Sequence, residues 1–161
     1  MKIKILSVGG TIDKIYFDQK SVYEIGEPQV ITILRDANTS LEFECESVLK
    51  KDSLDMTDED RLFIDKKIRS EPCNRIIVTH GTDTMVETAK ALMPNTDKTI
   101  VLTGAVEPAR FKSSDASFNI GGAIIAVQIL PSGVYIVMNG QIFQPEQVRK
   151  NYDLNRFECL E

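Results

Sequence analysis

The chain has 161 residues, of which 42% are hydrophobic and 27% are charged, a balance typical of one globular domain with a buried core. Its net charge of −5 and its scattered basic residues exclude a basic surface for nucleic acid or for anionic lipid. His80 is the single histidine, which excludes zinc sites built on paired histidines, and we expect neither a metal nor a cofactor.

The cysteines and the N-terminal residues bear on the cellular compartment. Cys45, Cys73 and Cys159 are far apart and odd in number, which is typical of reduced thiols rather than of a disulfide framework. The apolar run at residues 1–6 is shorter than that of a signal peptide and lacks a cleavage site. Apolar runs also stay well below the ~20 residues of a membrane span. We therefore expect a cytoplasmic protein.

Five stretches of the chain predict β-strands. Four of them, residues 3–8, 76–79, 100–103 and 134–138, are apolar and β-branched, as in strands that are buried on both faces of a parallel sheet. A further strand is predicted around residues 41–49.

Three helical patterns lie between these strands. The first begins at Thr57, where the sequence Thr-Asp-Glu-Asp resembles a capping box, and ends before Pro72. The second, residues 85–93, keeps a 3.6-residue apolar period and stops at Pro94. The third spans residues 113–130. Alternating strands and helices predict a single α/β domain: an open, mostly parallel sheet with helices on both faces.

Small-residue turns follow four of the predicted strands, at the edge where open α/β sheets bind ligands. The turns are Gly9-Gly10-Thr11, His80-Gly81-Thr82, Gly104-Ala105 and Asn139-Gly140. We expect them to converge on one crevice. The first two turns also have an ordinary structural interpretation: taken alone, Thr11 bonds its own backbone in a strand-ending turn, Thr82 is a helix N-cap with Asp83 in the first turn, and His80 is a packing residue.

A threonine hydroxyl in such a crevice is inert at neutral pH unless a base takes its proton. With one histidine in the chain, the available bases are lysine, tyrosine, aspartate and glutamate. Thr82, Asp83 and Lys150 have the chemistry for a proton relay, in which the lysine acts after desolvation or through an intervening carboxylate and hydroxyl. Tyr16 and Tyr23 lie on a polar stretch, after the first turn, that is long enough to fold over the site.

Taken together, these segments resemble the bacterial-type L-asparaginases. The turn Gly9-Gly10-Thr11-Ile12 is similar to the first signature of that family, and His80-Gly81-Thr82-Asp83-Thr84-Met85 is similar to its longer second signature. Three further segments follow in the order of the family: Thr103-Gly104-Ala105-Val106-Glu107-Pro108, Ser114-Asp115 with Phe118-Asn119, and Val137-Met138-Asn139. Five motifs in order argue strongly against coincidence.

The resemblance implies a flavodoxin-like α/β domain, the N-terminal domain of a typical member, and an L-asparaginase activity. L-Asparagine is then hydrolysed to L-aspartate and ammonia, with Thr11 as the nucleophile of a covalent acyl-enzyme. Thr82, Asp83 and Lys150 form the second triad that the resemblance implies.

The substrate-binding residues also follow from the resemblance. Ser53 and Asp83 hold the α-carboxylate and α-amino groups of the substrate, and the Ala105 carbonyl lies near the amide. Backbone N–H groups beside the two threonines serve as oxyanion donors, which adds Gly10 and Gly81 to this set.

At two positions this sequence matches the family pattern less clearly. The tyrosine of the family's flexible loop is Tyr23 by the Glu-Ile-Gly that follows it, or Tyr16 by its nearness to the first turn. Leu54 stands where many members carry a polar residue that binds the α-amino end of the substrate. The alternatives to asparagine hydrolysis are therefore hydrolysis of another amide, such as glutamine, and a non-catalytic amino-acid-binding domain.

The C-terminal domain of typical members is not part of the resemblance, so we expect residues 1–161 to form one domain, as in short-chain asparaginases, and to assemble as a homodimer or larger homo-oligomer. The tail after Lys150 carries four apolar residues: Tyr152, Leu154, Phe157 and Leu160. We expect this tail to dock across a two-fold interface, with packing on its own protomer as the alternative.

Overall fold

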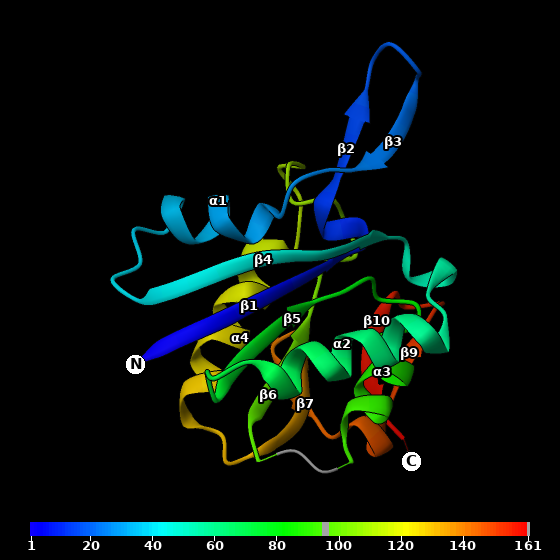
Figure 1. Ribbon diagram of the computed structural model, residues 1–161. Helices are drawn as coiled ribbons and strands as arrows, with labels where there is room; N and C mark the ends of the chain where they lie inside the picture. The colour runs from blue at the N-terminus through cyan, green and yellow to red at the C-terminus, as the bar shows by residue number, and fades with distance from the viewer. Residues whose placement is uncertain (95–96, 161) are drawn as a thin grey trace.

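The computed structural model describes residues 1–94 and 97–160, and its centre is a six-stranded sheet (Figure 1). The sheet contains, in spatial order, β4 (Glu42–Lys51), β1 (Lys2–Gly9), β5 (Arg75–Thr79), β6 (Thr99–Thr103), β7 (Gly133–Met138) and β8 (Gln141–Phe143). The first five strands are parallel, and β8 returns antiparallel to β7. The prediction of an open, mostly parallel sheet is confirmed, and each of the five predicted strands is present.

Helices cover both faces of this sheet, as predicted (Figure 1). On one face lie α2 (Asp58–Ser70) and α3 (Met85–Leu92), and on the other lie α1 (Gln29–Asp36) and α4 (Ala116–Ile129). The strands alternate accordingly, since side chains point to opposite faces with a period of two. In β1, for example, Ile5 packs among the residues of α1 and α4, whereas the next residue, Leu6, packs among those of α2 and α3.

The helix starts differ in how well the sequence predicts them. The predicted capping box of α2 is present, since the Thr57 and Asp60 side chains each accept a hydrogen bond from the other residue's backbone N–H. By contrast, α4 begins at Ala116 rather than at Ser113. The preceding residues are used elsewhere: the Ser114 hydroxyl donates to the Glu107 carbonyl. The loop after β6 is thereby tied to the start of α4.

Several elements lie outside the predicted pattern. They are the hairpin of β2 (Lys14–Phe17) and β3 (Val22–Ile25), helix α1, strand β8, the hairpin of β9 (Val148–Asn151) and β10 (Arg156–Cys159), and three short 3-10 turns, η1 (Thr11–Asp13), η2 (Ser53–Asp55) and η3 (Pro145–Gln147). The β2–β3 hairpin stands clear of the sheet beyond the end of β1 (Figure 1). In the part of the chain that the structure describes, no helix has the length and apolar character needed to cross a membrane.

The C-terminal tail packs on its own chain. β10 pairs antiparallel with β9, and Phe157 is buried with Val148 and Met138 in the core on the α2–α3 face. The prediction that the tail docks across a two-fold interface is therefore wrong for Phe157, because its ring completes this core. Tyr152, Leu154 and Leu160 remain exposed on the surface, and Glu161 lies outside the described residues.

Candidate active site

The strand order positions a crevice at the carboxyl ends of β1 and β5. After β1 the chain passes to β4 on one side of it and then to β5 on the other, so the order reverses between β1 and β5. Open α/β sheets bind ligands at such a switch point. The turn η1, with Thr11 at its start, follows β1, and the segment from His80 to Asp83 follows β5. The predicted convergence of these two turns is confirmed.

Two glycines allow the turns to touch. Gly10 has φ of 87°, and a Cβ built on it would lie 2.3 Å from the backbone nitrogen of Gly81. A Cβ on Gly81 would in turn lie 2.6 Å from Cβ of Ser53 and 2.7 Å from its Oγ. Larger residues would force these backbones apart, since real Cβ atoms do not approach that closely. The turns after β1, β4 and β5 are therefore in direct contact.

Lys150 joins this site from the C-terminal hairpin, 67 residues after Asp83 along the chain. Its Nζ donates hydrogen bonds to Thr82 Oγ1 at 2.8 Å and to Asp83 Oδ1 at 2.7 Å. The lysine side chain is only 10% exposed, and Thr82 is buried. The structure therefore brings together the three residues of the predicted relay.

This contact corrects the ordinary interpretation of the second turn. Helix α3 begins at Met85, with Thr84 rather than Thr82 at the N-cap position. Thr82 and Asp83 precede the helix, and their side chains bind Lys150.

Ser53 lies on the other side of Asp83, at the start of η2. Its hydroxyl oxygen accepts a hydrogen bond from the Asp83 backbone N–H at 3.2 Å, and its carbonyl accepts one from the Thr84 hydroxyl at 2.6 Å. Ser53 is 2% exposed, whereas the adjacent Leu54 is 72% exposed. Burial and these two hydrogen bonds hold Ser53 in one place beside Asp83.

Two buried ionisable groups, Asp13 and His80, lie within the turns and form hydrogen bonds to neighbouring residues. The Asp13 carboxylate accepts hydrogen bonds from the Ser7 hydroxyl and the Gln29 backbone N–H, both at 2.8 Å, and burial raises its pKa to about 6 against these opposing bonds. His80 is fully buried, with its ring nitrogens bonded to the Gly81 carbonyl and the Thr88 hydroxyl, and burial lowers its pKa to about 4. The interpretation of His80 as a packing residue is confirmed.

The loop after β6 closes a third side of the crevice. Ala105 is fully buried there, and the carbonyl of the preceding residue, Gly104, accepts a hydrogen bond from the Asn119 side chain at 3.0 Å. Asp115 accepts from the backbone N–H groups of Val106 and Glu107. Within residues 1–94 and 97–160, no cluster of histidine, cysteine, aspartate and glutamate side chains is arranged to hold a metal ion.

The sequence matches the family described as "Asparaginase, N-terminal" over residues 2–160, nearly its whole length. The chain belongs to the asparaginase family. In this asparaginase domain, the turns that contain Thr11 and Thr82 lie side by side, because Gly10 packs against Gly81.

Similar proteins agree with this assignment. The chain is 32% identical to "L-asparaginase 2" of Escherichia coli (strain K12) over 160 residues, which cover 92% of the chain and 46% of that protein. It is 31% identical to "Glutaminase-asparaginase" of Acinetobacter glutaminasificans over 121 residues, or 72% of the chain and 35% of that protein. The solved thermostable L-asparaginase from Thermococcus kodakarensis superimposes with a TM-score of 0.88 at 27% identity, covering 99% of the chain and 51% of that structure. The chain thus spans about half the length of L-asparaginase 2 and of this solved structure.

The two candidate tyrosines of the asparaginase domain face each other across the β2–β3 hairpin. Tyr16 and Tyr23 are cross-strand partners, with ring centroids 5.4 Å apart and both side chains half exposed. Tyr23 also meets the edge of the Phe111 ring, at 6.2 Å. The two rings therefore form one pair on the same hairpin.

Tyr152 is a site residue that sequence reasoning missed, since the sequence marks it only as an apolar residue of the tail. Its ring lies over Lys150 Nζ, which is 4.9 Å from the ring centroid, and its hydroxyl reaches the Asp83 carbonyl at 3.5 Å. Burial, and then the charges of Asp83 and Glu87, raise the pKa of Tyr152. The available signal was the spacing of two residues from Lys150, which puts both side chains on one face of an extended segment.

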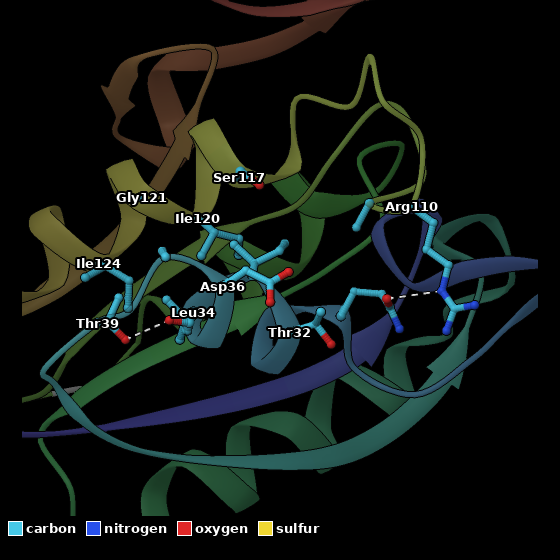
Figure 2. Close-up of a pocket in the computed structure, with 13 residues that line it drawn as sticks. Thr32, Leu34, Asp36, Thr39, Arg110, Ser117, Ile120, Gly121 and Ile124 are labelled. Carbon is cyan, nitrogen blue, oxygen red and sulfur yellow. Dashed lines mark hydrogen bonds between the residues drawn. The ribbon is translucent and has the colours of Figure 1, made fainter.

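Two hollows elsewhere on the asparaginase domain flank helix α4. One, of about 470 Å³, lies between α4 and α1, and Figure 2 shows Arg110 at its end bonded to the Gln29 side chain. The other, of about 570 Å³, lies between α4 and β8 and is lined by Phe118, Ile125 and Ile129 among other uncharged residues. Neither is lined by a residue of the predicted relay.

Proposed function

We propose that this asparaginase domain hydrolyses L-asparagine to L-aspartate and ammonia through a covalent acyl-enzyme on Thr11. The observation that carries the proposal is the contact of Lys150 Nζ with Thr82 Oγ1 at 2.8 Å and Asp83 Oδ1 at 2.7 Å. A shielded amine is thereby connected to the turn that packs against the Thr11 turn. Activation of a threonine by a neighbouring base needs such an arrangement.

In the proposed reaction, Thr11 Oγ1 attacks the side-chain amide carbon of the substrate as its hydroxyl proton passes to a base. The carbon–nitrogen bond then breaks, ammonia leaves with a proton, and a β-aspartyl ester remains on Thr11. Attack by water on this ester releases L-aspartate and restores the threonine hydroxyl. For the proton relay, we propose that the Thr82 hydroxyl carries the proton between the reacting oxygen and the Lys150–Asp83 pair, since Lys150 Nζ contacts Thr82 Oγ1 at 2.8 Å and Asp83 Oδ1 at 2.7 Å.

The substrate-binding roles are proposed on the same geometry. The Ser53 oxygen accepts from the Asp83 N–H, so the Ser53 O–H is left to donate to the α-carboxylate, while the Asp83 carboxylate binds the α-amino group. We propose the Ala105 carbonyl as an acceptor for the amide N–H₂. The prediction of Gly10 as an oxyanion donor does not fit, because its N–H already donates to the Lys51 carbonyl at 2.9 Å, so we propose the backbone N–H groups of Thr11, Gly81 and Thr82 instead.

Glutamine hydrolysis is a second candidate, favoured by the similarity over 121 residues to a protein named for both glutaminase and asparaginase activity. We expect asparagine to be the better substrate, because one extra methylene in a fitted pocket shifts discrimination by about 1–3 kcal/mol. Leu54, being exposed, leaves the α-amino end with fewer polar partners, so we expect modest affinity for either substrate.

The experiment that tests these proposals is ammonia release by the purified chain, with asparagine and glutamine measured side by side. Release with a larger kcat/KM for asparagine is expected, and equal or reversed values would contradict the proposed pocket size. Binding of asparagine without any ammonia release would contradict turnover and favour an amino-acid-binding domain. The same assay tests whether the single domain of residues 1–161 is sufficient for activity.

We also propose a homodimer, formed through the exposed face of α4. The helix has no charged residue along its 14 residues, and Phe118, Ile125 and Ile129 are each more than half exposed on it. A helix that is apolar on all sides is normally covered. A second copy fits this face because two neutral, apolar surfaces meet without the repulsion expected elsewhere on a chain of net charge −5.

Light scattering tests this interface with a matched pair of variants. Ile125→Lys adds a charge to the exposed face of α4 and should convert a dimer to a monomer. Leu62→Lys, on the exposed side of α2, makes the same change outside the interface and should leave the dimer intact. A wild-type chain that is monomeric at all concentrations, or variants with equal effects, would refute the proposal.

For the compartment, we propose the cytoplasm. The proposal rests on Cys45, Cys73 and Cys159, which are free thiols in the structure. Cell fractionation tests it, and recovery of the chain in an exported fraction would contradict it.

A further inference from the structure

A buried amide side chain connects the loops on two sides of the crevice. Asn119, on α4, is 1% exposed. Its Nδ2 donates to the Gly104 carbonyl at 3.0 Å and to Asp115 Oδ2 at 2.8 Å, and its Oδ1 accepts from the Asn139 backbone N–H at 3.1 Å. Each of its polar atoms is therefore bonded. Asn119 holds the loop that leads to Ala105 and, at the same time, the turn after β7.

Asn139 continues this connection into the C-terminal hairpin. It follows β7 with φ of 53°, in the left-handed region that asparagine tolerates better than most residues. Its side-chain Oδ1 accepts a hydrogen bond from the Phe157 backbone N–H at 2.8 Å. The turn after β7 is thereby bonded to strand β10, 18 residues later in the chain.

Phe157 is the residue directly opposite Lys150. In the register of the β9–β10 hairpin, Phe157 pairs with Lys150. The Phe157 ring is 1% exposed in the core, so both its side chain and its N–H are held by the body of the domain. The two-stranded hairpin shares no ladder with the six-stranded sheet. Together with Val148, which is 2% exposed in the same core, Phe157 therefore anchors the hairpin that carries Lys150.

We propose that Asn139 is a positioning residue for Lys150, acting through the Phe157 backbone. In this proposal, Asn119 fixes the position of Asn139 relative to the loop that carries Ala105. This inference rests on the function proposed above for Lys150, but its structural part, the anchoring of the hairpin, does not need turnover. Asn139 touches neither the relay nor the substrate groups. Its effect is to keep the Lys150 amine within hydrogen-bond distance of Thr82 and Asp83.

Two substitutions at this position separate anchoring from backbone geometry. Asn139→Gly keeps the left-handed conformation without strain and removes the acceptor for the Phe157 N–H. Asn139→Asp keeps an acceptor oxygen at the same place. The matched control is Asn155→Gly in the turn between β9 and β10, where the backbone has nearly the same φ, 48°, and the side chain is exposed.

Steady-state kinetics with asparagine test the positioning role. We expect Asn139→Gly to lower kcat by about tenfold or more with little change in KM, because a small displacement of a reacting group has effects of this size. Asn139→Asp should restore kcat to near the wild-type value, and Asn155→Gly should not differ from wild type. A wild-type kcat in Asn139→Gly, or an equal loss in the aspartate variant, would overturn the proposal.

Amide hydrogen exchange tests the anchor itself, independently of activity. In Asn139→Gly the Phe157 amide should exchange about tenfold faster or more, since it loses its acceptor, while the Asn155→Gly chain should retain the wild-type rate. Unchanged exchange would overturn the inference. A wild-type chain that releases no ammonia would instead refute the proposed function, and faster Phe157 exchange in Asn139→Gly would still support the anchor.

Discussion

His80 and Asp13 should give the folded domain two opposite dependences on pH. Burial lowers the pKa of His80 from 6.5 to about 4, so between these values the unfolded chain binds a proton that the folded chain does not. The free energy of unfolding therefore falls as the pH falls from 6.5 to 4, by about 3 kcal/mol. Stability from the neutral His80 is fully present above pH 6.5.

Asp13 acts with the other sign over nearly the same range. Burial raises its pKa from 3.8 to about 6, so in this window the folded chain keeps a proton that the unfolded chain releases. The free energy of unfolding therefore falls as the pH rises from 3.8 to 6, again by about 3 kcal/mol. In the wild-type chain the two contributions nearly cancel between pH 4 and 6.

Single substitutions should reveal how each group alone makes the free energy of unfolding depend on pH. That free energy is measured by urea unfolding at steps from pH 4 to pH 7. Asp13→Asn leaves the His80 contribution unopposed, so its stability should fall by about 3 kcal/mol between pH 6.5 and 4 relative to wild type. His80→Gln leaves the Asp13 contribution, so its stability should fall by a similar amount as the pH rises from 4 to 6. Each variant is judged by how its free energy of unfolding changes with pH, because each substitution also alters local hydrogen bonds and thereby the stability at every pH.

The control is Asp153→Asn, which removes an exposed carboxylate and should keep the wild-type slope. If the Asp13→Asn and His80→Gln chains also keep that slope from pH 4 to 7, the two buried groups do not exchange protons on unfolding as described. That result would refute the assignment of opposite pH dependences to their burial.

Three predictions concern the site. Thr11→Ala should leave the fold intact and reduce ammonia release at least about 100-fold, and a smaller loss would remove Thr11 from the nucleophile role. Lys150→Met keeps most of the aliphatic stem, so kcat should fall by about 10²–10⁴ with little change in KM, whereas a change mainly in KM would make Lys150 a binding residue. Gly81→Ala places a methyl group 2.6 Å from Cβ of Ser53, so it should raise KM by displacing that residue, and an unchanged KM would argue against a binding role for Ser53.

The sequence predicted the elements whose pattern is local and repeated. Strands β1, β5, β6 and β7 are buried on both faces, so their apolar, β-branched runs are visible without knowledge of the fold. Helix α2 carries its own start signal in the Thr57 capping box. The edge strand β4 was harder to locate, because its burial alternates and charged residues interrupt it.

The hairpins lack such signals. The β2–β3 hairpin is short and largely exposed, so its residues show little apolar alternation. Helix α1 has only eight residues and begins after Pro28 without a polar N-cap side chain. In the tail, the apolar character of Phe157 indicates that it must dock, but the core that receives it includes residues of β7, α2 and α3, which no local pattern relates to it.

In the site as well, some contacts follow from nearby sequence and strand order, whereas others depend on residues far away in the chain. The Gly10–Gly81 contact follows from topology, because two turns at the switch point of a sheet in this order must meet. Lys150 is different. Its side-chain chemistry made it a candidate base, but its position in the site depends on the β9–β10 hairpin, which Phe157 anchors in the core. Because that hairpin shares no ladder with the main sheet, the proposed relay geometry depends on the hydrogen bond that the Phe157 N–H donates to Asn139 Oδ1, and this bond contributes little to the stability of the whole domain. A substitution in the turn after β7 should therefore impair the chemistry long before it unfolds the chain.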